Sequence, residues 1–199
     1  MINLAVVLGR IPKIVLFGAA GLIQIGLVGL MVVDRVVILR TGSDVILQTR
    51  PLDPRDFLRG DYVVLGYDIS SVPAGALKDQ RSTGLDALVF VKLAPNRDGF
   101  YEAISVHAAP VEVASPEVLI RGRIISGAQC GVDRRTFCGT LQVRYGIERY
   151  FVPEGEGKKL ESARNQRKLT VVAAVVPTGR AAIKRLLIDG EPVYDEPWY

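Results

Sequence analysis

The chain has 199 residues, with 25 basic and 21 acidic side chains, a net charge of +4 and a pI near 9.2. After the first ~35 residues, the remaining length is enough for one domain with a hydrophobic core and too short for two. The charges are mixed along the chain, without a basic stripe with interleaved aromatic residues, and this argues against a nucleic-acid binder.

Residues 14–33 form an apolar run in which Gln24 is the only strongly polar side chain. A helix of about 20 residues crosses a hydrocarbon core of about 30 Å. The run is longer than the apolar part of a signal peptide, and no small-x-small cleavage site follows it. We therefore expect an uncleaved transmembrane anchor over residues 14–34, a cytoplasmic N-terminus over residues 1–13 and an extracytoplasmic domain over residues 36–199.

The orientation depends on the cysteines, because the basic residues on the two sides of the run nearly balance. Cys130 and Cys138 are the only two cysteines, and their spacing suits a bridged turn between two strands. Disulfides form in exported domains, so a Cys130–Cys138 disulfide would place this domain outside the cytoplasm. Two unpaired cysteines are the alternative; two thiols and the distant His107 do not complete a zinc site. We expect no metal and no cofactor, and we interpret His107 as a structural residue.

Four glycines of the apolar run share one helical face: Gly18, Gly21, Gly26 and Gly29. Such a face allows close approach of another membrane helix, which indicates a membrane-protein partner besides the lipid bilayer. General tolerance of glycine in membrane helices is the alternative interpretation.

After Arg35 the sequence changes to short β-like runs separated by turn residues. The expected strands cover residues 44–49, 62–69, 87–93, 100–107, 118–125, 140–144, 150–152, 169–176 and 181–188, and the one expected helix covers residues 157–166. No βαβ alternation is present, which argues against a parallel nucleotide-binding sheet. The sequence predicts a mainly β protein with a single antiparallel β-rich domain, barrel or sandwich-like, with one short helix.

One segment combines turn glycines, aromatic residues and charges: Gly60-Asp61-Tyr62, then Leu65 and Tyr67. It resembles the motif of the GDYXXLXY family of bacterial membrane-anchored proteins, and residues 145–161 are similar to that family's other block. The resemblance implies a single-pass protein of the bacterial cytoplasmic membrane, with its domain in the periplasm or extracytoplasmic space. It also implies a multi-pass membrane protein as a partner. The family is defined by its motif rather than by an activity.

Physical chemistry suggests roles for these residues. Alternation places Val63, Leu65, Tyr67 and Ile69 on one apolar face of the strand. Asp61 can accept backbone N–H bonds in a turn at Gly60. We expect this strand to pack beside residues 145–161, where a charged cluster would form from Arg55, Arg59, Glu154 and Glu161. We expect six residues to be structural: Arg55, Arg59, Gly60, Asp61, Leu65 and Glu161. Tyr62, Tyr67 and Glu154 are the candidates for contact with a ligand or partner.

The leading functional hypothesis is a membrane-anchored binding or assembly module that is an accessory partner of another membrane protein. One alternative is an enzyme that uses the carboxylates Asp61, Asp68, Glu154 and Glu161, which would require them to converge in an open pocket. The other is an inactive peptide-binding domain similar to type I signal peptidases, which residues 58–64 and 150–155 resemble in order and spacing. No serine occurs in residues 53–59, and no lysine occurs between Lys13 and Lys78, so peptidase activity does not carry over.

Overall fold

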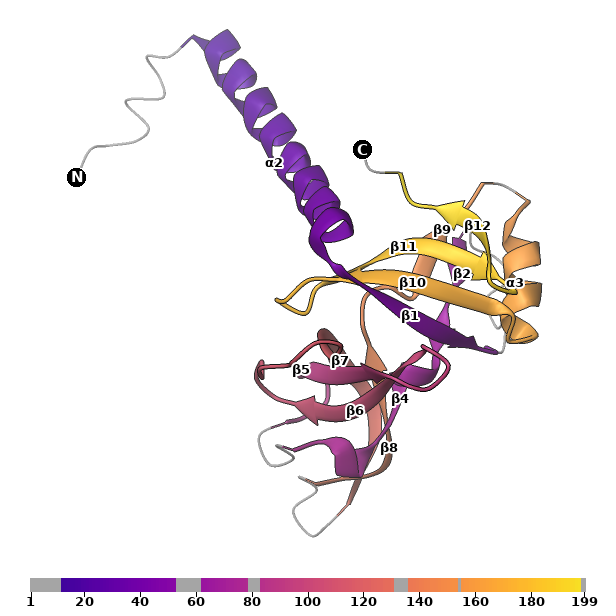
Figure 1. The fold of residues 1–199 in the computed structure, drawn as a ribbon. Helices are drawn as coiled ribbons and strands as arrows, with labels where there is room; N and C mark the ends of the chain where they lie inside the picture. The colour runs from indigo at the N-terminus through magenta and orange to yellow at the C-terminus, as the bar shows by residue number, and fades with distance from the viewer. Residues whose placement is uncertain (1–11, 53–61, 79–82, 131–135, 154, 198–199) are drawn as a thin grey trace. The chain divides into compact units, whose positions relative to one another are not determined.

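The computed structural model describes residues 12–52, 62–78, 83–130, 136–153 and 155–197. The chain divides into two compact parts, residues 1–37 and residues 38–198. Helix α2, Lys13–Thr41, begins in the first part and ends in the second (indigo in Figure 1).

Helix α2 is long and apolar enough to cross a membrane, with a mean hydropathy of 2.2 over its most apolar window. None of that window is buried, which distinguishes α2 from the core helix of a soluble domain. The helix continues beyond the predicted membrane segment, through Arg35 to Thr41.

The second part is mostly β, as the sequence predicts. One antiparallel sheet has the order β12-β11-β10-β1-β3, a second has the order β4-β8-β7-β5-β6, and β2 and β9 form a two-stranded ribbon. The strands are β1 Ser43–Arg50, β2 Tyr62–Val64, β3 Gly66–Tyr67, β4 Ser71–Pro73, β5 Leu88–Pro95, β6 Tyr101–His107, β7 Val118–Cys130, β8 Thr136–Arg144, β9 Arg149–Phe151, β10 Leu169–Val175, β11 Ala181–Ile188 and β12 Glu191–Asp195. The short helices are α3 Gly157–Asn165 and the 3-10 turns η1 Asp68–Ser70 and η2 Ala74–Ala76.

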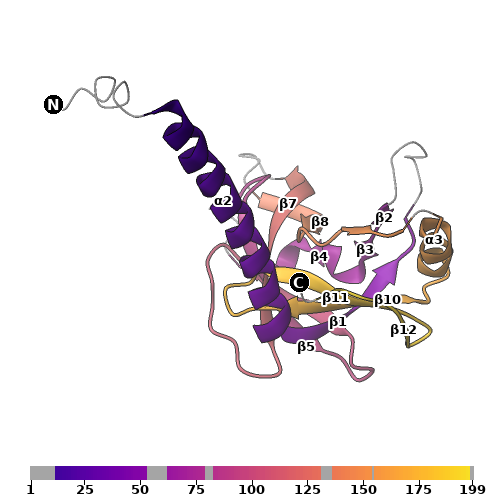
Figure 2. The same ribbon diagram turned by 90° about the horizontal axis from the view of Figure 1, so that it is seen from above.

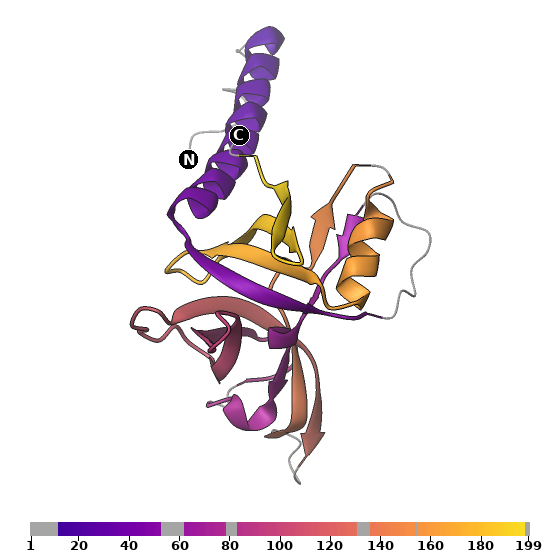
Figure 3. The same ribbon diagram turned by 45° about the vertical axis from the view of Figure 1, so that its right-hand side comes forward.

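The two large sheets enclose one hydrophobic core (Figures 1 and 3). Most of the core side chains come from alternate positions along the strands. Val45 and Leu47 of β1 point inward, as do Val89 and Val91 of β5. Strand β10 is buried along its whole length because neighbouring strands flank it and both of its faces are covered.

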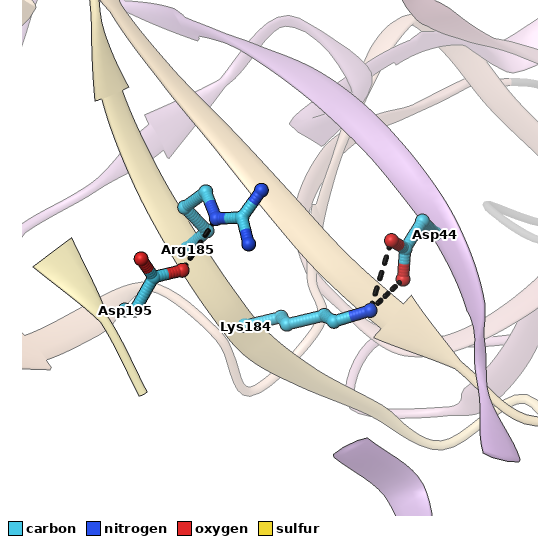
Figure 4. A network of polar contacts seen from close by, with 4 residues as sticks. All are labelled: Asp44, Lys184, Arg185 and Asp195. Carbon is cyan, nitrogen blue, oxygen red and sulfur yellow. Dashed lines mark hydrogen bonds and ion pairs between the residues drawn. The ribbon is translucent and has the colours of Figure 1, made fainter. Parts of the chain in front are cut away.

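The last turn of α2 is part of the β domain. Ile38 and Leu39 are buried against Ala174, Val176 and Ala182 of the β10–β11 hairpin. On the same sheet, ion pairs join β1 to β11 and β11 to β12 (Figure 4): Lys184 Nζ lies 2.7 Å from Asp44 Oδ1, and Arg185 pairs with Asp195. These pairs are exposed and contribute little stability individually.

The structure contains the predicted disulfide. Cys130 at the end of β7 is bridged to Cys138 on β8, with their Cα atoms 6.0 Å apart. The bridge therefore connects two neighbouring antiparallel strands, as the spacing predicts.

The predicted strand 62–69 is divided in the structure. Strand β2 pairs with β9, whereas β3 pairs with β1, so the chain changes partner at Leu65 and then forms the turn η1. The predicted alternation nevertheless holds, since Val63, Leu65, Tyr67 and Ile69 are all buried.

Candidate functional site

The segment around the β2–β9 ribbon brings the two distinctive blocks of the sequence together. Tyr62 lies opposite Phe151, and Val64 lies opposite Arg149. Helix α3 packs against β2 and also contacts β10 and β1 (Figure 2). The prediction that this strand packs beside residues 145–161 is confirmed for the described residues.

Two buried tyrosine hydroxyls tie these blocks together in opposite directions. Tyr67 Oη donates to the backbone oxygen of Ile147 at 2.5 Å. Tyr145 Oη donates to the backbone oxygen of Ile69 at 2.6 Å. Because each phenol is buried, its hydroxyl needs such a partner, and the pair fixes the register between the motif segment and the turn that follows β8.

Glu148 closes that turn. Its carboxylate accepts hydrogen bonds from the backbone N–H of Tyr145 and, at 2.8 Å, from that of Gly146, while its backbone oxygen accepts from Leu65 N at 2.8 Å. Gly146 has a φ of +84°, in the left-handed region that favours glycine. Burial raises the pKa of both Tyr67 and Tyr145, and the nearby charge of Glu148 raises each pKa further.

Arg164 of α3 connects the helix to the motif segment from inside the domain. Its guanidinium donates to the backbone oxygen of Val64 and, at 3.4 Å, to that of Leu52, and it also bonds Asn165 Oδ1 at 3.0 Å. The residue is almost completely buried, and burial lowers the pKa of the guanidinium. These bonds satisfy one backbone oxygen at the end of β2 and one just after β1.

The outer face of the ribbon is apolar and aromatic. Phe151 is 77% exposed and Val64 39% exposed. The rings of Tyr62 and Phe151 have centroids 5.9 Å apart, and the Arg149 guanidinium carbon lies 5.6 Å from the centroid of Tyr62. We call Tyr62, Val64, Arg149 and Phe151 the aromatic ribbon face.

The structure places the predicted site residues in different environments. Tyr62 is partly exposed on the aromatic ribbon face, whereas Tyr67 is fully buried and does not reach a surface where a ligand could touch it. Leu65 is buried in the core, and Glu161 is partly exposed on α3. Five candidates lie outside the described residues: Arg55, Arg59, Gly60, Asp61 and Glu154.

Two of the four carboxylates proposed for an enzyme are described. Asp68 lines a hollow of about 310 Å³ with Glu102, Gln48 and Asn96, whereas Glu161 lies on α3 and is not part of its lining. Across the described residues, no group of three or more His, Cys, Asp and Glu side chains is arranged to hold a metal ion. His107 lies on β6, with a ring nitrogen 2.8 Å from the Ser105 hydroxyl.

Sequence reasoning missed Arg164, Glu148 and Phe151. Arg164 follows Leu160 by one helical turn, so an arginine on the apolar face of α3 was a detectable signal. Glu148 lies two residues after a glycine in a turn, a position suited to capping by a carboxylate. Phe151 carried no such signal, because its exposure depends on which face of β9 meets the core.

Fold and site together define a class of protein: an antiparallel β domain that follows a helix able to span a membrane. In this domain, two buried tyrosine hydroxyls connect the motif segment to the turn that follows β8. The chain belongs to the GDYXXLXY family, whose model, described as "GDYXXLXY protein", matches residues 24–186. The family's namesake positions in this chain are Gly60, Asp61, Tyr62, Leu65 and Tyr67. Comparisons with curated proteins and with solved structures gave no significant match.

Proposed function

We propose that this protein is a single-pass, membrane-anchored module whose extracytoplasmic β domain binds another membrane protein through the aromatic ribbon face. The observation that carries the proposal is Phe151, an aromatic side chain 77% exposed to solvent beside Tyr62 and Arg149. Tyrosine and arginine are enriched where binding energy concentrates in protein interfaces, and phenylalanine is enriched in interfaces relative to the rest of the protein surface.

The anchor is supported by the exposure of α2. Its large side chains, such as Ile14, Phe17 and Met31, are each more than 70% exposed. In water such a surface would be strongly unfavourable, and lipid removes that cost. An added Cβ at Gly18, Gly21, Gly26 or Gly29 would meet no atom within 4 Å, so this face is open to a partner helix.

The disulfide supports an extracytoplasmic domain in the periplasm, with the N-terminus in the cytoplasm. Disulfides persist in oxidising compartments and are rare in the cytosol. The bridge between Cys130 and Cys138 therefore favours the exported orientation.

Site-specific photocrosslinking tests the interaction in intact membranes. A photoreactive phenylalanine analogue at position 151 should crosslink the full chain to an integral membrane protein. The matched control is the same analogue at Ile104, which is 53% exposed on β6, away from the ribbon. The crosslinked product should form from position 151 and not from position 104.

The matched substitutions are Phe151→Ala and Ile104→Ala. Phe151→Ala should abolish co-purification of the crosslinked partner, and Ile104→Ala should leave it unchanged. Because both side chains are exposed, neither change should lower the free energy of unfolding by more than about 0.5 kcal/mol. Equal crosslinking from both positions, or undiminished co-purification with Phe151→Ala, would refute the proposed interface.

A further inference from the structure

Three arginines meet on the outer face of the second sheet. Arg121 and Arg123 alternate outward along β7, with Gly122 between them, and Arg144 lies directly opposite Arg123 on β8. All three residues are exposed. They line an open hollow of about 460 Å³, with Leu88, Tyr145 and Gly146 completing its wall. We call this feature the arginine hollow.

The pairing of Arg123 with Arg144 is unfavourable for the fold. Like charges at directly opposite positions of neighbouring antiparallel strands repel each other. Asp86 lies beside one of these arginines: its Oδ1 is 3.9 Å from Arg123 Nη1, which also donates a hydrogen bond to the Asp86 backbone oxygen at 2.8 Å. The Asp86 side chain is 81% exposed, and such an ion pair offsets little of the repulsion.

The hollow is also held in place by the backbone. The N–H of Arg121 donates to Gly179 of the β10–β11 turn at 2.8 Å, and an added Cβ at Gly179 would lie 3.1 Å from Arg121 N. At Gly122 an added Cβ would lie 2.6 Å from Val143 Cγ1, so β7 and β8 approach closely there. The three arginines therefore project from a rigid, closely packed part of the sheet.

We infer that the arginine hollow binds a phosphate-type oxyanion, from either a soluble phosphate ester or a phospholipid headgroup. Guanidinium groups bind phosphate through two parallel N–H bonds, and three of them around one hollow match the oxygens of such a group. A bound anion would also remove the repulsion between Arg123 and Arg144. This site is separate from the aromatic ribbon face, so the two proposals stand independently.

Calorimetric titration of inorganic phosphate into the full chain in maltoside micelles, at constant ionic strength, tests the inference. The wild-type protein should bind phosphate saturably, at one site per chain. The double variant Arg123→Gln/Arg144→Gln should bind it at least about tenfold more weakly, since each charged hydrogen bond to an anion is strong. As a control, Arg97→Gln removes one positive charge from an exposed turn and should change the affinity less than about twofold.

Two further measurements sharpen the test. In phosphate-free buffer, Arg144→Gln should raise the melting temperature, because it relieves the repulsion on Arg123. In nanodiscs, phosphatidylglycerol should weaken phosphate binding if a headgroup reaches the hollow, whereas unchanged binding identifies a soluble phosphate ester. Absence of saturable phosphate binding, a double variant that binds like Arg97→Gln, or a lowered melting temperature for Arg144→Gln would each overturn the inference.

Discussion

Two tyrosines of the family motif, five residues apart, have different environments. Tyr67 is fully buried, and its hydroxyl bonds the backbone of Ile147, whereas Tyr62 is partly exposed beside Phe151. The phenol of Tyr67 therefore holds the fold, and the ring of Tyr62 is available for recognition. The sequence predicted both as contact residues, because alternation alone does not show how deeply each face of a strand is covered.

Removing the Tyr67 hydroxyl should destabilise the protein. Tyr67→Phe leaves the Ile147 backbone oxygen buried without its donor, and such a loss costs about 1–3 kcal/mol. The control is Tyr101→Phe, which removes a tyrosine bond to a backbone oxygen that is exposed to water. That change should cost less than about 0.5 kcal/mol. Urea unfolding of the full chain in micelles measures both values, and equal costs would contradict the structural role of Tyr67.

The same tyrosines predict a loss of stability at alkaline pH. Because the pKa of Tyr67 and of Tyr145 is raised in the folded protein, the unfolded chain loses these protons first, near pH 10. Below pH 10 both phenols keep their protons in the folded and the unfolded chain, so their contribution to the free energy of unfolding is complete. Above pH 10 the free energy of unfolding should fall by up to about 1.4 kcal/mol per pH unit for each tyrosine.

The double variant Tyr67→Phe/Tyr145→Phe isolates this effect. Its unfolding free energy, measured from pH 8 to pH 12, should decline less steeply above pH 10 than that of the wild-type protein. Parallel curves for the two proteins would show that these phenols do not cause the alkaline loss.

The change of partner strand at Leu65, from β9 to β1, determines the shape of the motif segment. Periodicity predicted nearly every long strand and the helix α3, because their burial alternates or follows a helical repeat. It did not predict β4 or β12, which are short and contain Pro73 and Pro192. It also merged β2 and β3, since a strand that exchanges one neighbour for another keeps the same alternation.

The junction between α2 and β1 is closely packed around Gly42. A Cβ at Gly42 would lie 2.7 Å from Ile38 O and 2.8 Å from Val175 N, both backbone atoms that cannot rotate away. Gly42→Ala should therefore cost about 1–3 kcal/mol. Gly75→Ala is the control, because an added Cβ there meets nothing within 4 Å. Thermal unfolding compares the two variants, and an unchanged melting temperature for Gly42→Ala would contradict the close packing of this junction.

For the whole molecule, the sequence predicted an apolar helix followed by one antiparallel β domain with a disulfide, and the structure has these features. These features can be predicted because they depend on the composition of short segments and on the periodicity of their apolar residues. The aromatic ribbon face and the arginine hollow were not predicted, because each combines residues from strands whose pairing depends on the complete fold. The proposed partner and phosphate sites therefore rest on tertiary structure.

We propose that α2 holds this β domain outside the cytoplasmic membrane. The most direct test is protease treatment of intact spheroplasts that produce the full chain with a C-terminal epitope tag. We predict that the tag is removed while the spheroplasts are intact, and that a cytoplasmic marker protein survives. Protection of the tag until the spheroplasts are lysed would contradict the claim.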